Sequence, residues 1–426
     1  MKRVVILCVW LFSVVAGHAQ LSLDECRRLA RENYPEIRQY DLVHQTEQYN
    51  LSNAARAWIP QIAFSAQATW QTDAPNFPKE LTGMLAQQGL EIPGLRKDQY
   101  KVALELNQTI WDGGKSVADK RIARAEAAEQ KTMTDVDLYE LEGRVDDLYF
   151  GILLLDERIA QTNLTLNLLR SNLEKVRALQ RNGVAMQSDA DVLEAELLSV
   201  GQQLIQFESS CDSYRRMLGI FIGQKVGDRK LQRPSAVQPL SGESARPELA
   251  MFAAKIDRLT AQEKMVKSSS MPRLGFFAQG YYGYPGLDYM QSMMNSDWSW
   301  NAMLGVKLSW NFGAYYTQKN NLNKLRISRQ QVEVQLDVFL FNMNLQAAQE
   351  NGDIARLRKA IADDDRIVAL RRSVREAAES KLRNGIIDTH DLLSKITDES
   401  TASMARSMRE IELLKAIYEY KHTINR

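Results

Sequence analysis

The chain has 426 residues, enough for two or three structural modules. Its 54 lysines and arginines balance 53 acidic residues, and the formal net charge of +1 gives no electrostatic basis for binding nucleic acid or an anionic membrane surface. Charged residues make up 25% of the chain while glycine and proline are few, which argues against general disorder.

Residues 1–19 have the pattern of a cleaved secretory signal peptide. Lys2 and Arg3 precede an apolar run from Val4 to Val15, and Gly17-His18-Ala19 supplies a small-x-small cleavage site. The alternative, a transmembrane anchor, requires a longer apolar run. Because no stretch of about 20 apolar residues follows, a helical integral membrane protein is excluded, but a β-barrel with its weaker signal per strand is not.

The rest of the sequence repeats a set of short segments in the same order, which indicates a duplication. The paired segments are Pro35 and Pro247, Pro60 and Pro272, Trp111–Gly114 and Trp310–Gly313, and Arg181–Gly183 and Arg383–Gly385. We therefore expect a first repeat over residues 20–221, an irregular linker over 222–246 and a second repeat over 247–426.

Both repeats contain the same expected elements. The first has a short helix over about 22–57, strands at about 61–70 and 100–111, a long helix at about 114–182 and a return helix at about 188–221. The second has a short helix over about 247–269, strands at about 273–282 and 299–311, a long helix at about 314–384 and a return helix at about 388–424. We expect the chain to turn between helix and strand at Pro60, Gly113, Gly114, Pro272 and Gly313.

The expected strands alternate apolar and polar residues, as strands with one apolar face do. In the stretch 300–310, Trp300, Leu304 and Leu308 fall on one face, with Asn301 and Lys307 on the other. A run of this length can cross a bilayer as a tilted strand. The alternation also predicts that Lys101, Glu105, Arg273 and Lys307 point inward and keep the interior of a barrel wet.

All the tryptophans after the signal peptide lie at or beside the ends of the expected strands. An ordinary β-sandwich core would place tryptophan in the middle of its strands, whereas aromatic girdles at two membrane interfaces place it at the ends. We therefore favour a girdle made of Trp58, Trp70, Trp111, Trp298, Trp300 and Trp310.

The long helices need a neighbour along most of their length. About 70 residues of helix span on the order of 100 Å, more than a globular domain holds. In the first repeat an apolar stripe with spacings of four and three runs from Leu141 to Ile159 and resumes at Leu166, and the return helix carries the same rhythm from Leu193 to Phe221. This 3.5-residue period predicts left-handed coiled coils, in which the short helices stack end to end beside the long ones.

The sequence offers little for catalysis. The three histidines after the signal peptide, His44, His390 and His422, lack metal-ligand spacing, and no phosphate-binding loop or nucleophile elbow is present. The run Asp363–Asp365 points in several directions around a helix and is interpreted as a solvated face. We expect no enzymatic activity, no cofactor and no metal site.

Four strands cannot close a barrel, and an open sheet edge in lipid leaves backbone groups unsatisfied. Several copies of the chain must therefore share one barrel. Over roughly residues 22–424, the duplicated helix–strand–strand–helix pattern, the Trp111–Gly114 turn and the segments Gly183–Asp189 and Gly385–Asp391 resemble the TolC-type outer-membrane efflux protein family. That resemblance implies a mainly helical fold, with two tandem repeats per chain. It also implies a homotrimer with a shared twelve-stranded β-barrel in the outer membrane and a twelve-helix periplasmic α-barrel.

The resemblance also implies partners and sites. The periplasmic end would be a gate that opens when a periplasmic adaptor and an inner-membrane pump of the RND or ABC type dock. Asp391 matches the family's cation-selective pore aspartate and Asp189 its partner in the first repeat. The adaptor-contact tips match Arg181, Asn182, Gly183, Arg383, Asn384 and Gly385.

Two positions depart from the family pattern: Ser394 replaces a second pore aspartate, and Ile387 replaces an arginine that holds the closed gate. The spacing of Asp189 and Asp391 after a turn equally suggests helix N-capping. With the resemblance we favour the pore for Asp391 and leave Asp189 open.

The favoured function is a trimeric export duct in the outer membrane, part of a tripartite efflux or type I secretion system. The alternative is a periplasmic coiled-coil structural or adaptor protein. The sequence does not choose between drug efflux and protein secretion.

Overall fold

The computed structural model describes residues 20–89, 92–235, 244–384 and 386–425. The expected signal peptide, residues 236–243 of the expected linker and Gly385 lie outside these ranges. The chain divides into two compact units, a helical unit (Met1–Tyr40, Thr132–Ala250 and Gln335–Arg426) and a sheet unit (Asp41–Lys131 and Met251–Val334). Each unit takes residues from both repeats, so the units cut across the duplication. None of the described helices combines the length and hydrophobicity needed to cross a membrane.

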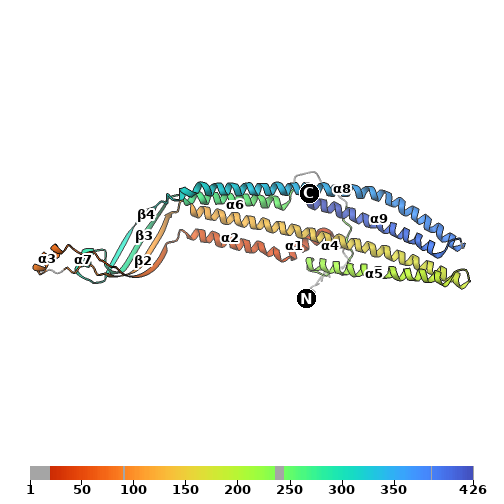
Figure 1. Cartoon of the computed structure of the whole chain (residues 1–426), viewed down its shortest axis with the longest axis horizontal. Coiled ribbons are helices and arrows are strands. Elements are labelled where there is room, and N and C mark those ends of the chain that lie inside the picture. Colours follow the sequence, from red (N-terminus) through yellow and green to blue (C-terminus); the bar gives the residue numbers. More distant parts are fainter. Residues whose placement is uncertain (1–19, 90–91, 236–243, 385, 426) are drawn as a thin grey trace, which may run out of the picture. The chain divides into compact units, whose positions relative to one another are not determined.

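The sheet unit contains a four-stranded antiparallel sheet in the order β1-β2-β3-β4 (Figure 1). Its strands are β1 (Gln61–Trp70), β2 (Asp98–Trp111), β3 (Arg273–Tyr284) and β4 (Ser299–Ser309). Two short helices, α3 (Lys79–Gln87) and α7 (Tyr289–Met294), lie in the strand connections, for which the sequence predicted no helix or strand. Helices this short show too little periodicity to be distinguished from loops by their pattern.

The first short helix is not continuous, contrary to the expectation of one helix over about 22–57. It consists of α1 (Leu23–Asn33), a 3-10 turn (Pro35–Arg38) and α2 (Gln39–Arg56). Tyr34 has ψ 129° because the proline that follows disfavours a helical conformation in the preceding residue. Pro247 instead begins α6 (Pro247–Ser269). Each matched proline therefore begins a helical segment, and in the first repeat α1 precedes that proline.

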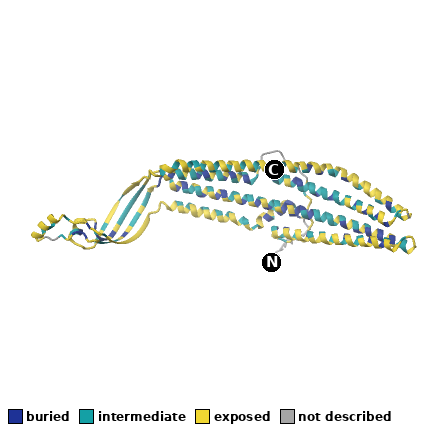
Figure 2. Cartoon of the chain, in the orientation of Figure 1, coloured by how far each residue is buried: buried dark blue, intermediate teal, exposed yellow. Residues whose placement is uncertain are grey.

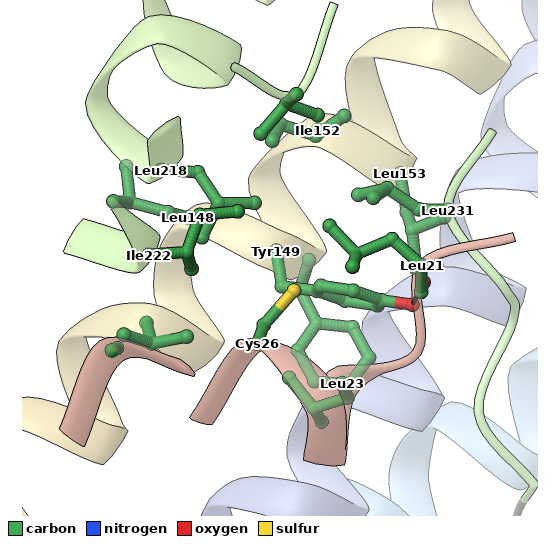
Figure 3. Close-up of a cluster of buried hydrophobic side chains, with 14 of the residues drawn as sticks. Leu21, Leu23, Cys26, Leu148, Tyr149, Ile152, Leu153, Leu218, Ile222 and Leu231 are labelled. Carbon is green, nitrogen blue, oxygen red and sulfur yellow. Dashed lines mark hydrogen bonds between the residues drawn. The ribbon is translucent and has the colours of Figure 1, made fainter. Parts of the chain in front are cut away.

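The coiled-coil stripe forms the core of the helical unit. Its helices are α4 (Lys115–Arg181), α5 (Gln187–Ile222), α8 (Ala314–Arg383) and α9 (Thr389–Ile424), with α4 and α8 contributing to both units. Leu141, Val145 and Ile152 of α4 are fully buried. Figure 3 shows the same cluster around Tyr149, with Cys26 as a buried thiol among leucines.

Short helices meet end to end within the helical unit, as the lengths predicted. At the end of α5, the Asn33 amide of α1 donates to the carbonyls of Ile220 and Phe221, both at 3.1 Å. At the end of α9, the Asn425 amide donates to the Ala245 carbonyl just before α6, at 2.6 Å. Polar side chains thus satisfy helix-terminal carbonyls that would otherwise lack partners.

Candidate functional site

The register of the sheet separates its side chains onto two faces. Residues paired across antiparallel strands share a face, and the pairs Phe64–Leu104, Leu104–Gly280 and Ala278–Leu304 place the apolar residues together. The apolar face carries Ile62, Phe64, Trp70, Val102, Leu104, Leu106, Leu274, Phe276, Tyr282, Trp300, Leu304, Val306 and Leu308. The polar face carries Gln61, Ser65, Gln67, Lys101, Glu105, Asn107, Arg273, Gln279, Asn301, Lys307 and Ser309.

On the polar face, the neutral Gln279 of β3 links two charged side chains of β2. The Lys101 ammonium donates to Oε1 of Gln279 at 3.0 Å, and the Gln279 amide donates to Glu105 at 2.5 Å. The Lys101 ammonium also lies 4.7 Å from the centre of the Tyr281 ring. Lys101, Glu105, Arg273 and Lys307 lie on one face, as the alternation predicted; that this face lines a lumen remains a proposal.

The apolar face is exposed in the single chain. Phe64 is 71% exposed, Leu104 56% and Leu304 75%, and β1 contains no buried residue (Figure 2). An apolar surface of this extent marks a contact with another protein or with lipid.

The six tryptophans form two groups at opposite ends of the sheet. At one end, the ring of Trp298 stacks on that of Tyr100, with 5.6 Å between the ring centres. Trp300 of β4 and Trp70, the last residue of β1, lie at this same end. At the other end, the Trp310 indole donates to the Ser270 carbonyl at 3.0 Å, and the Trp58 carbonyl accepts from Gln108. Trp111 ends β2 at this same end. This placement is the one that a girdle requires, and the girdle itself stays a prediction.

The strand-to-helix turns of the two repeats are built differently. Pro60 and Pro272 both directly precede a strand. Gly113 and Gly114 adopt φ of +70° and +85°, which favours glycine, and a Cβ at Gly113 would lie 2.6 Å from Cβ of Met271. Gly313 has no such conformation; its N–H donates to the Asn311 side chain at 3.1 Å.

Asp112 begins α4 as an N-terminal cap. Its carboxylate accepts from the N–H groups of Gly114 at 2.9 Å and Ser116 at 2.6 Å, and from the Ser116 hydroxyl. Burial opposes ionisation, but the hydrogen bonds from Ser116 and Gly114 outweigh it and hold the pKa of Asp112 below its usual value.

We expect Asp112→Asn to lower the free energy of unfolding by about 2 kcal/mol at pH 7, the scale of hydrogen bonds to a charged group. Because the folded-state pKa is depressed, this contribution is complete above the unfolded-state value, near 4, and is lost as the pH falls through the folded-state value. Denaturant unfolding of the wild type and of Asp112→Asn between pH 7 and pH 2 measures this contribution. Asp119→Asn, which alters only a partly exposed pair with Lys115, is the control; a pH-independent difference would contradict the prediction.

The two tips of the helical hairpins share a backbone motif. At the end of α4, Gly183 has φ +76° and the Val184 N–H donates to the Leu179 carbonyl at 2.9 Å. The Ile386 N–H donates likewise to Lys381 at 3.0 Å after α8. These are the five-residue-apart bonds of a Schellman ending. The predicted adaptor-contact side chains at both tips are exposed, namely Arg181, Asn182, Arg383 and Asn384.

Asp189 and Asp391 occupy the same position after the two tips but differ in their bonds. The Asp189 carboxylate accepts from the Met186 N–H at 2.8 Å and so closes a capping box. At the second tip Asp388 is the cap, accepting from the Asp391 N–H at 2.8 Å. The exposed Asp391 carboxylate is thus not needed for capping.

Part of the chain matches a known protein family. Residues 27–223 match the model of a family described as outer membrane efflux protein. No protein of curated function matches the sequence significantly. The match confirms the predicted resemblance over these residues.

Solved structures extend the likeness to both repeats. The outer-membrane channel OprN aligns with a TM-score of 0.70 and 14% identity over 94% of this chain and 89% of that one. The outer membrane protein VceC of Vibrio cholerae aligns with a TM-score of 0.66 and 14% identity, over 94% of this chain and 95% of that one. The CmeC channel of Campylobacter jejuni aligns with a TM-score of 0.65 and 14% identity, over 94% of this chain and 85% of that one. At this identity the likeness establishes the fold, and it confirms the mainly helical class with a small antiparallel sheet.

Sequence reasoning missed an ion-pair network near the tips of the helical hairpins. The Arg375 guanidinium of α8 donates to Glu399 of α9 at 2.7 Å and to Glu379 at 2.9 Å, while Lys175 of α4 lies 3.4 Å from Glu379. Arg375 and Glu399 are almost buried. Nothing in the heptad pattern indicates which opposite charges will meet across three helices. Nearby, Ile387 packs against the apolar tip cluster of Leu169, Leu193 and Leu392.

The interpretation of Asp363–Asp365 as a solvated face is wrong for its central residue. Asp364 is buried and accepts from Arg409 of α9, and Asp365 accepts from Arg406 at 2.6 Å. A buried carboxylate requires such a partner. Among the described residues, no group of three or more histidine, cysteine, aspartate or glutamate side chains that could hold a metal ion is assembled.

Proposed function

We propose that three copies of this chain form a water-filled export duct, with four strands from each closing a twelve-stranded barrel. The observation that carries the proposal is the two-faced sheet, whose apolar face would meet lipid and whose Lys101–Gln279–Glu105 face would line the passage. Polar residues facing a lumen and apolar residues facing lipid are the requirement for a membrane barrel.

The open edges of the sheet explain why several copies are needed. In the described chain, β1 and β4 each have a partner on one side only. In lipid, every unpaired backbone group costs several kcal/mol, so the edge β1 of one copy would pair with β4 of the next. Two copies would give eight strands, a barrel filled by its own side chains, whereas three give twelve and room for a solute.

The helical unit would continue the passage into the periplasm and meet the partners of the duct. The exposed tips around Arg181 and Arg383 would contact a periplasmic adaptor, which links the duct to an inner-membrane pump of the RND or ABC type. The duct carries out no reaction and uses no cofactor in this proposal. Ile387, in the apolar tip cluster, and the Arg375 network would hold the closed state in place of the family's arginine.

Membrane fractionation and mass separate this proposal from a periplasmic coiled-coil protein. The duct requires the mature protein to sediment with outer membranes, to need detergent for extraction and to have three times the chain mass in detergent. Recovery in the soluble fraction without detergent would support the coiled-coil alternative, and a monomer or dimer in detergent would contradict the shared barrel.

Asp391→Asn should weaken the cation preference of single channels in a planar bilayer, because it removes a charge that the proposed trimer displays three times. Asp388→Asn is the matched control, since this neighbouring cap forms the hydrogen bond to the Asp391 N–H. Because asparagine caps a helix about as well as aspartate does, we expect this control to keep both the helix and the selectivity close to those of the wild type. Equal selectivity in wild type and Asp391→Asn would remove Asp391 from the pore.

A further inference from the structure

The short helix α7, in the connection between β3 and β4, is rich in methionine (Figure 1). Methionine accounts for 15 of the 426 residues of the chain but for three of the six residues of α7, namely Met290, Met293 and Met294. Methionine thioethers are soft metal ligands that suit Cu(I). The placement of these side chains therefore decides whether α7 can bind a metal ion.

Ser292 fixes which side of α7 faces the protein. It is buried, and its hydroxyl accepts from the Gly286 N–H at 3.0 Å and donates to the Asp288 carbonyl at 2.8 Å. Each residue turns a helix by about 100°, so residues two positions before and two positions after Ser292 lie on the opposite face. Met290 and Met294 occupy those two positions.

Both of these methionines are exposed to solvent. Met290 is 56% exposed and Met294 44%, whereas Met293 packs against the buried cluster around Tyr284. Residues four apart on a helix have about 5–6 Å between their Cβ atoms. The methionine side chain is unbranched and flexible, so two sulfur atoms at this spacing can meet at one ion.

The helix is held in place, although a helix of six residues is unstable by itself. The Met293 carbonyl accepts from the Gly94 N–H at 3.2 Å. The Tyr284 hydroxyl donates to the Ser292 carbonyl at 3.0 Å and accepts from the Arg96 N–H at 2.9 Å. These bonds fix α7 to the segment before β2. A bound ion would then order only two side chains, which lowers the cost of binding.

We propose that Met290 and Met294 bind a soft monovalent metal ion, Cu(I) or Ag(I), between their sulfur atoms. Both ions accept two sulfur ligands in a linear arrangement. Zinc instead favours thiolate and imidazole ligands, and magnesium favours oxygen. A thioether pair of this kind leaves no histidine or cysteine spacing in the sequence. The site lies within the sheet unit, and the proposal does not rest on export or on the trimer.

Nuclear magnetic resonance of the methionine methyl groups tests the site on the full protein in detergent. The probe is silver nitrate in chloride-free buffer. We expect the Met290 and Met294 methyl resonances to shift with the same saturation curve, because both bind one ion. The resonance of Met186, which is 74% exposed beside a hairpin tip, should not shift. Silver bound to the buried thiols Cys26 and Cys211 does not affect this readout, which is confined to methionine.

Leucine variants separate a metal ligand from an apolar surface residue. Met290→Leu and Met294→Leu each keep the apolar surface and remove one sulfur atom. Outer partners of metal ligands already contribute about 10- to 100-fold to affinity, so losing a ligand should raise the Ag(I) concentration at half saturation at least about tenfold. The control Met186→Leu should titrate like the wild type, and zinc sulfate should shift neither resonance.

Three results would overturn the proposal. They are the absence of a saturable shift at Met290 and Met294, an equal shift at Met186, and an unchanged half saturation in either leucine variant of α7. The last result would leave contact with lipid or another protein as the role of this exposed surface. An equal response to zinc would likewise contradict a site selective for soft monovalent ions.

Discussion

Phe64→Arg is expected to keep the chain out of the outer membrane, whereas Ser65→Arg, one residue along the same strand, leaves it inserted. Phe64 lies on the apolar face opposite Leu104, and Ser65 lies on the polar face opposite Ala103. An arginine on the lipid side of a membrane strand costs about 2–4 kcal/mol near the bilayer centre. In the proposed trimer this cost arises three times, while the same charge in a wet lumen costs little.

Outer-membrane fractionation and the amount of folded oligomer extracted by detergent measure this difference. Both variants introduce the same side chain into an exposed position of β1, so expression and charge are matched. Equal loss of both proteins from the membrane would show that β1 tolerates no charge at all, and equal insertion would place the apolar face away from lipid. Either outcome would contradict the proposed orientation of the sheet.

Arg375→Ala is expected to lower the free energy of unfolding by about 3 kcal/mol, because removing one partner leaves a nearly buried charge uncompensated. The residue left behind is Glu399, whose side chain is 10% exposed. Its other described ion-pair partner, Arg372, is 61% exposed. Arg371→Ala breaks a pair with the adjacent Asp398, but both of those side chains are exposed. We expect that control to cost less than about 1 kcal/mol.

Denaturant unfolding followed by helical circular dichroism compares the two alanine variants. Hydrogen exchange then locates the effect: amides near residues 375–400 should exchange faster in Arg375→Ala than in Arg371→Ala. If the network also holds the closed state, single channels of Arg375→Ala should open more often. Similar stabilities for both variants would mean that the network of Arg375 contributes no more than a surface ion pair.

Elements with a regular pattern and clear end signals could be predicted from the sequence. β1 lies at the expected residues 61–70, and α8 lies within one residue of the expected 314–384. The failures are local. The sequence did not predict the break at Tyr34, although the Pro35 that causes it was noted as a repeat marker. The connecting helices α3 and α7 are too short for their period to be visible.

The candidate sites could likewise be predicted from the sequence only in part. In the sequence, Asp189 and Asp391 follow their turns at the same spacing. Only the structure shows that Asp189 caps its own helix, whereas Asp388 caps the helix that contains Asp391. The methionines of α7 are visible in the sequence. Which of them are exposed depends on the hydrogen bonds of the buried Ser292.

The sequence by itself determined the duplication, the two-faced strands and the coiled-coil helices, because these follow from periods of 2 and 3.5 residues that any single chain displays. Only the tertiary structure decided which distant charges meet, such as Arg375 with Glu399 and Arg409 with Asp364. It also decided which methionines of α7 are exposed. Pairing and packing across helices depend on register and rotamer choice between different helices, for which the local pattern carries no signal.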